Sequence, residues 1–237
     1  YRNGDGVTED DSQAVYWYRK AAEQGDSDAQ LKLGFMYANG EGVTEDDTQA
    51  VYWYRKAAEQ GDSDAQLKLG FMFDLGKGVA EDDKQAVYWY KKAAEQGDAA
   101  AQFNLGVMYD LGNGVAEDDT LAVYWFRKAA EQGFAKAQYN LGNMYKYGEG
   151  VTEDDTQAVY WYKKAAEQGE AKAQYKLGFM FDLGKGVAED DTQAVYWYRR
   201  AAEQGHATGQ WSLAFMYKYG EGVAEDYILA YKWANLA

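Results

Sequence analysis

The 237-residue chain contains no cysteine and no proline, and it has a single histidine, His206. The absence of cysteine excludes disulfides, thiol catalysis and thiolate metal sites. A single histidine leaves no multi-histidine metal site and removes the most common general base. We therefore expect no catalytic residue, no bound metal and no cofactor.

Basic residues are also scarce: 24 Lys and Arg stand against 39 Asp and Glu, a net charge of −15. Nucleic-acid-binding proteins neutralise phosphates with clustered Lys and Arg, so this acidic chain is not expected to bind nucleic acid. Apolar runs such as 14–18 fall far short of the roughly 20 residues of a membrane-spanning helix, so no membrane insertion is expected. With 47% hydrophobic residues, the chain has enough apolar material to bury a core.

The most prominent feature of the sequence is a period of 36 residues. Residues 9–44 and 45–80 are identical at 30 of 36 positions, and seven tryptophans recur at this spacing without insertion. Repeats of this length form arrays in which neighbouring units bury each other's apolar faces. The tryptophans are Trp17, Trp53, Trp89, Trp125, Trp161, Trp197 and Trp233.

Each unit contains the signals for two helices. Asp10, with Gln13 three residues later, predicts the start of the first helix, and Gly25 predicts its end. A second helix is expected over 29–37, and the glycine pair in 40–43 ends the unit.

The acidic residues before each first helix admit two interpretations, helix capping or a divalent-cation site. They lack the alternating spacing of a calcium-binding loop, and capping explains them without a further assumption. His206 occupies the helix-start position of Asp26, and we expect it at the surface.

Helical phase separates a buried face from an exposed one. At about 100° per residue, Ala14, Trp17 and Tyr18 share the face expected to be buried, and Tyr16 lies nearly opposite. Tyrosine recurs at the position of Tyr16 in six units, flanked by basic residues, until Lys232 breaks the row. The row either binds a partner protein or is a self-satisfied surface, with each ring resting on its own Arg and Lys stems. The candidate partner-binding residues are Tyr16, Tyr52, Tyr88, Tyr124, Tyr160, Tyr196, Arg55, Lys56, Lys91, Arg127, Lys128 and Lys163.

A second apolar row runs along the second helices, away from their main apolar stripe. We expect it to pack between units, with partner specificity at its exposed edges as the alternative, because the repeats differ here. Asn143 is the polar exception. The row comprises Leu31, Leu67, Phe103, Tyr139, Tyr175 and Trp211, with Phe35, Phe71, Val107, Asn143, Phe179 and Phe215 four residues later.

The motifs resemble those of the Sel1-like repeat family. Ala-x-x-Trp-Tyr-x-Lys-Ala-Ala-Glu-Gln-Gly stands at 50–61, Ala-Gln-x-x-Leu-Gly-x-Met at 65–72 and Gly-x-Gly-Val-x-x-Asp at 76–82. The resemblance implies an all-α fold, a right-handed α/α superhelical solenoid of 36-residue helix-turn-helix repeats, similar to tetratricopeptide arrays. First helices would line its concave face. We expect one solenoid domain over 1–237, about six and a half repeats, and a fragment of a longer array because neither end resembles a polar capping unit.

The same resemblance implies a non-enzymatic protein–protein interaction scaffold. Exported enterobacterial members of the family include one that binds secretory immunoglobulin A, which would imply a secreted or periplasmic location, a virulence role and a host protein as partner. A small-molecule or peptidoglycan-fragment binder is one alternative, although the family branch associated with such ligands pairs cysteines that this chain lacks. An idealised or purely structural array is another.

Overall fold

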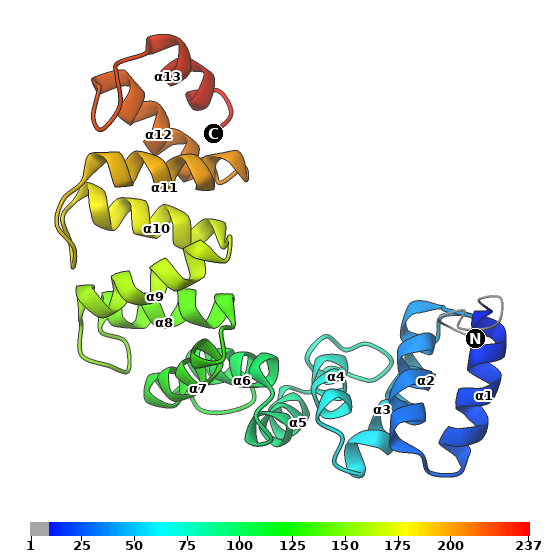
Figure 1. Ribbon diagram of the computed structural model, residues 1–237. Helices are drawn as coiled ribbons and strands as arrows, with labels where there is room; N and C mark the ends of the chain where they lie inside the picture. The colour runs from blue at the N-terminus through cyan, green and yellow to red at the C-terminus, as the bar shows by residue number, and fades with distance from the viewer. Residues whose placement is uncertain (1–9) are drawn as a thin grey trace. The chain divides into compact units, whose positions relative to one another are not determined.

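The computed structural model describes residues 10–237, and every regular element in that range is an α-helix. The expectations for Tyr1, for the glycine pair at 4–7 and for Glu9 lie outside this range. The described chain divides into two compact units, residues 10–118 and 119–237. Helices α1–α6 belong to the first unit and α7–α13 to the second (Figure 1).

The helices of the first unit are α1 (Asp11–Glu23), α2 (Ser27–Asn39), α3 (Asp47–Glu59), α4 (Ser63–Asp74), α5 (Asp83–Glu95) and α6 (Ala99–Leu111). Those of the second unit are α7 (Asp119–Glu131), α8 (Ala135–Tyr147), α9 (Asp155–Glu167), α10 (Ala171–Asp182), α11 (Asp191–Glu203), α12 (Ala207–Tyr219) and α13 (Tyr227–Ala234). Within each unit, consecutive helices pack side by side (Figure 1). Each unit is therefore an all-α solenoid of helix pairs, as predicted.

Side-chain caps begin both helices of a repeat. Asp10 Oδ1 accepts a hydrogen bond of 3.0 Å from the backbone N–H of Gln13, which confirms the predicted start of the first helix. Asp26 Oδ1 accepts one of 2.7 Å from the N–H of Ala29. This second cap places the start of α2 at Ser27, two residues earlier than the prediction.

The two glycines between repeats have different tasks. Gly40 ends α2 in the left-handed conformation, with φ 68°. Gly42 also has a positive φ, and a Cβ atom built there would lie 2.4 Å from the carbonyl oxygen of Asp11. The first glycine therefore ends a helix, while the second lets the loop lie against the start of the first helix of the same repeat.

The predicted core is present, with one correction. Trp53 is only 8% exposed and packs with Ala14, Leu33 and Met36 of the preceding helix pair. Trp17, by contrast, is 52% exposed, so the expectation that it is buried was wrong. The reason is that each tryptophan packs onto the preceding helix pair, and no helix precedes α1 in the described residues.

Most of the second apolar row packs between repeats, as expected, whereas Trp211 and Phe215 in the last repeat are exposed. The ring of Phe71 meets that of Tyr90 edge to face at 5.5 Å, and Tyr175 stacks on Tyr198 at 5.9 Å. The exception, Asn143, accepts a hydrogen bond of 2.7 Å from the hydroxyl of Tyr162 on the next first helix. Its amide therefore replaces an apolar contact with a polar one.

Candidate partner-binding surface

The six tyrosines of the predicted row are exposed on the first helices, three in each unit. Their exposed fractions lie between 47% and 50%. Neighbours in sequence are buried, for example Val51 and Trp53 on either side of Tyr52. The helical phase therefore predicted the exposure of this row correctly. Its members are Tyr16, Tyr52 and Tyr88 in the first unit, and Tyr124, Tyr160 and Tyr196 in the second.

Each tyrosine ring is held by the tryptophan that follows it. Tyr52 and Trp53 meet edge to face with ring centroids 4.8 Å apart, and the other five pairs have the same geometry at 4.8–5.1 Å. Because the tryptophan is itself packed into the core in five of the six repeats, the exposed ring has a rigid support. Such pairs favour one orientation of the tyrosine side chain.

A basic side chain four residues later lies over each tyrosine ring. Lys56 Nζ is 5.7 Å from the ring centroid of Tyr52, and Lys128 Nζ is 5.1 Å from that of Tyr124. A hydrogen bond donated by Lys20 to Tyr16 raises the pKa of the Lys20 ammonium group. We call these six pairs the Tyr–Lys row, completed by Tyr16–Lys20, Tyr88–Lys92, Tyr160–Lys164 and Tyr196–Arg200.

The other basic position, three residues after each tyrosine, belongs to a different set of contacts. Arg127 Nη2 donates a hydrogen bond of 2.8 Å to the hydroxyl of Tyr145, on the second helix of the same repeat. The guanidinium group of Arg55 lies over the ring of Phe73, also on the second helix of its repeat, with Cζ 5.7 Å from the ring centroid. The structure thus brings Lys56 and Lys128 to the tyrosines but directs Arg55 and Arg127 to the second helices.

The two remaining candidates are not the cations over their tyrosines, because Lys92 lies over Tyr88 and Lys164 over Tyr160. Lys91 pairs with Glu95 one turn later at 4.0 Å, with both side chains more than half exposed. An exposed pair of this kind contributes little to stability. Lys163 is likewise exposed.

The interpretation as a self-satisfied surface describes part of this geometry. One face of each ring is covered by its own Lys or Arg, and one edge meets the tryptophan. About half of each tyrosine remains accessible, however, together with the basic group beside it. A partner can therefore contact both an aromatic ring and a cation at every repeat.

A buried amide ladder between repeats was not predicted. Gln30 is 3% exposed, and its Nε2 donates a hydrogen bond of 3.0 Å to the carbonyl oxygen of Ala22. Gln60 Nε2, in the next repeat, donates one of 2.7 Å to Gln30 Oε1. The sequence did contain a signal, because a glutamine recurs at the position of Gln30 in every second helix, among apolar residues.

His206 is more than a surface residue. Its Nδ1 accepts a hydrogen bond of 3.1 Å from the N–H of Gly209, so it caps α12 as Asp26 caps α2. Its ring stacks on Tyr175 at 5.0 Å, and partial burial, followed by the charge of Lys172, lowers its pKa. The expected helix-start position is confirmed, but the ring is only partly exposed.

Residues 10–237 contain no cluster of three or more His, Cys, Asp or Glu side chains in a metal-binding arrangement. The acidic residues before the first helices act as caps: Asp46 Oδ1, for example, accepts a hydrogen bond of 3.0 Å from the N–H of Gln49. In the same range, no helix has both the length and the apolar character needed to cross a bilayer.

Solved structures of other proteins share this arrangement. A protective antigen present in uropathogenic Escherichia coli strains, displaying an SLR fold, is 45% identical with a TM-score of 0.91 over 94% of this chain and 48% of that chain. The present chain thus spans about half the length of that antigen. A Sel1 repeat protein from Oxalobacter formigenes is 39% identical, with a TM-score of 0.84 over 100% of this chain and 68% of that chain. No functionally curated protein matches the chain significantly.

The Sel1 repeat profile matches the chain from end to end. The matched segments are residues 1–26, 27–62, 63–98, 99–134, 135–170, 171–206 and 207–237. Sel1 repeats share a non-catalytic, tetratricopeptide-like scaffold fold and generally mediate protein–protein interaction. With every helix from α1 to α13 inside a matched segment, this chain belongs to the Sel1 repeat family.

Proposed function

We propose that the chain is a non-enzymatic scaffold that binds a partner protein through the Tyr–Lys row. The supporting observation is the regular presentation, at every first helix from α1 to α11, of a half-exposed tyrosine with a basic side chain over its ring. The family resemblance predicts that this side of each unit is concave. A partner would lie along the first helices of a unit.

The chemistry of the row suits protein recognition. Tyrosine offers a large, rigid contact area and one polar tip at a low cost in side-chain entropy. The neighbouring Lys or Arg can pair with a carboxylate of the partner. On a chain with a net charge of −15, these cations favour a partner segment rich in acidic and aromatic side chains.

The first partner to test is a host protein, with secretory immunoglobulin A as the leading candidate. Two observations support this choice: the resemblance to exported enterobacterial Sel1-like proteins, and the 45% identity to a protective antigen of uropathogenic Escherichia coli. A secreted or periplasmic location and a role in virulence would accompany such a partner.

The test replaces Tyr88, Tyr124 and Tyr160 together by Ala and measures binding to immobilised secretory immunoglobulin A by interferometry. Because the three rings contribute exposed contact area and little core, we expect the fold to persist. The free energy of binding should fall by at least about 2 kcal/mol. A matched control is Tyr147→Ala, which removes an equally exposed tyrosine from a second helix. Unchanged binding by the triple variant, with a folded circular dichroism spectrum, would refute the role of the row.

A small-molecule or peptidoglycan-fragment binder is the rival function. Titration with muropeptides separates the two functions. Saturable binding at one site, with an affinity that the triple tyrosine substitution does not change, would favour the rival. A purely structural array predicts that neither ligand class binds. Capture from mucosal fluid and from the envelope of the source cell, with the triple variant as a parallel bait, extends the test to other partners.

A further inference from the structure

The inner contact between repeats is a tyrosine ring lying on a glycine. A Cβ atom built on Gly70 would lie 2.5 Å from Cδ1 of Tyr90, and one built on Gly178 would lie 2.7 Å from Cδ1 of Tyr198. Only glycine leaves room for the ring. The aromatic ring is therefore the group that fills the space between a second helix and the following first helix. The same contact joins Gly34 to Tyr54 and Gly142 to Tyr162.

Between α12 and α13, both members of this pair are replaced. Ala214 stands 36 residues after Gly178, and Ala234 stands 36 residues after Tyr198. No ring therefore fills the space between these two helices. A pocket of about 580 Å³ is present there instead, within the range typical of ligand sites.

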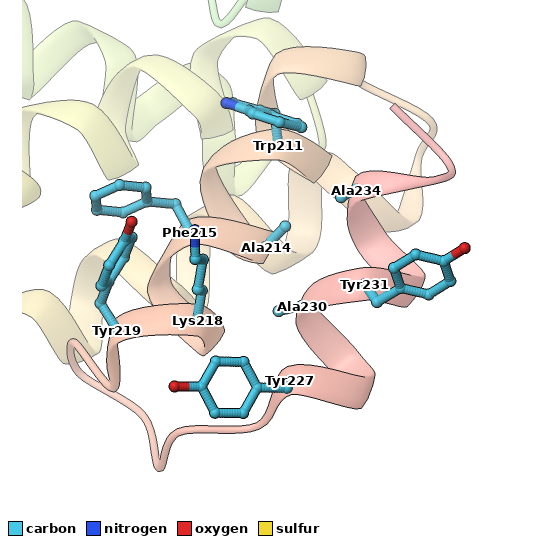
Figure 2. Close-up of a pocket in the computed structure, with 9 residues that line it drawn as sticks. All are labelled: Trp211, Ala214, Phe215, Lys218, Tyr219, Tyr227, Ala230, Tyr231 and Ala234. Carbon is cyan, nitrogen blue, oxygen red and sulfur yellow. The ribbon is translucent and has the colours of Figure 1, made fainter.

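Small side chains form the base of the pocket, and aromatic side chains form its walls. Figure 2 shows Ala214, Ala230 and Ala234 between the two helices, with the rings of Trp211 and Tyr227 on opposite sides. Trp211 is 61% exposed and Tyr227 is 64% exposed.

The charged residue at this place also differs from that of the preceding repeat. Tyr198 donates a hydrogen bond of 2.9 Å to Oδ2 of Asp182, and Lys218 stands 36 residues after that aspartate. A lysine already occurs at this position in another repeat, where Lys146 pairs with Asp155 at 2.8 Å. The counterpart of Asp155 beside Lys218 is Tyr227, which has no carboxylate.

Lys218 is consequently a cation without its usual counter-ion. Lys218 Nζ lies 5.0 Å from the ring centroid of Tyr219, and its charge also acts on the hydroxyl of Tyr227. Lys218 is one of the residues that line the pocket (Figure 2). The pocket therefore offers an aromatic surface for a ring and a cation for a negative charge.

We propose that the pocket between α12 and α13 binds an aromatic side chain of a polypeptide, with a neighbouring carboxylate of that polypeptide paired to Lys218. The ring would occupy the space that Tyr90 and Tyr198 fill in their own repeats. The carboxylate would take the place that Asp155 holds beside Lys146. This site is separate from the Tyr–Lys row and does not depend on it.

The probe is a blocked tetrapeptide of sequence Glu-Phe-Glu-Gly, titrated into the ¹⁵N-labelled 237-residue chain by NMR. We expect saturable shifts in α12 and α13. A Glu-Ala-Glu-Gly peptide should bind at least about tenfold more weakly, because it lacks the apolar ring. A Gln-Phe-Gln-Gly peptide should bind about three- to tenfold more weakly, because it lacks the charge. Equal affinity for all three peptides would overturn the proposal.

Two variants test the two halves of the site. Ala214→Gly with Ala234→Tyr restores the pair found in the other repeats; it should keep the chain folded and reduce binding at least about tenfold by filling the pocket. Lys218→Gln should leave the affinity for Gln-Phe-Gln-Gly unchanged. It should lower the affinity for Glu-Phe-Glu-Gly to the same value as that for Gln-Phe-Gln-Gly. Lys185→Gln, which alters an exposed loop lysine, is the matched control and should change neither.

The contrary results are equally specific. If the filled double variant binds the peptide as tightly as the original chain, the ring does not enter this pocket. If Lys218→Gln keeps the preference for the charged peptide, the carboxylate is bound elsewhere. If 3-phenylpropanoate binds while the peptide does not, the assignment to a polypeptide is wrong. The Lys218 comparison stands even if the double variant does not fold.

Discussion

Gln60 Nε2 donates a hydrogen bond of 2.7 Å to Oε1 of Gln30, thirty residues earlier in the chain. The same contact joins Gln96 to Gln66 at 2.8 Å. Each buried amide also donates to a carbonyl oxygen at the end of its own repeat's first helix, as Gln66 does to Ala58 at 3.1 Å. One side chain thus ties together two helices of its own repeat and the end of the first helix of the next repeat.

Replacing Gln66 by Ala should destabilise the chain by about 1–3 kcal/mol, because the Ala58 carbonyl and the Gln96 amide each lose one of their hydrogen bonds. Urea unfolding followed by circular dichroism gives the change. Gln85→Ala removes an exposed glutamine from the neighbouring helix and should shift the midpoint little. Equal effects of the two substitutions would contradict the importance of the buried ladder.

Gly70→Ala tests the tyrosine–glycine contact. Alanine favours a helix over glycine by about 1 kcal/mol, but its methyl group would lie 2.5 Å from Cδ1 of Tyr90. We expect a net loss of about 1–3 kcal/mol in the original chain.

In a Tyr90→Ala background, the same substitution should be neutral or stabilising, because the ring is gone. A double-mutant cycle measured by urea unfolding gives the coupling energy between the two residues. A coupling energy near zero would show that the contact is not the reason for the glycine.

Trp53→Ala and Trp17→Ala compare one residue type in two environments. Trp53 is 8% exposed, and its loss should cost about 3–5 kcal/mol. Trp17 is 52% exposed, and its loss should cost about 1 kcal/mol or less. Thermal unfolding of both variants measures the difference, and a Trp17 variant as unstable as the Trp53 variant would refute the packing of each tryptophan onto the preceding repeat.

His206 should make stability depend on pH. Partial burial lowers its pKa in the folded chain, so the unfolded chain binds a proton more readily. Stability should therefore fall as the pH drops from 7.5 to 5.5, and it should level off below the folded pKa. Protonation also removes the Nδ1 lone pair that caps α12, an effect of about 1 kcal/mol at most.

His206→Asn keeps a capping side chain but does not titrate in this range. Its melting temperature should change less between pH 7.5 and 5.5 than that of the original chain. The same pH dependence in both proteins would assign the effect to other groups.

Much of the fold followed from local patterns. The 36-residue period, the Asp10 cap and the glycine pair at 40–43 identified the helix pairs, because caps and turns depend on nearby residues. Helical phase correctly separated Ala14 from Tyr16 for the same reason. The exposure of Trp17 and the ladder through Gln30 were missed, since both depend on which repeat lies alongside.

The sequence by itself determined the repeat, its two helices and the exposed row of tyrosines, all of which follow from residues at most one helical turn or one repeat period apart. Only the tertiary structure decided which basic residue meets each tyrosine, that Arg127 turns to Tyr145, and that Ala214 and Ala234 leave a pocket. The contact of Arg127 and the pocket both require two helices to be brought together at a definite distance. The loss of a ring can be recognised as a cavity only when the position of the helix opposite it is known.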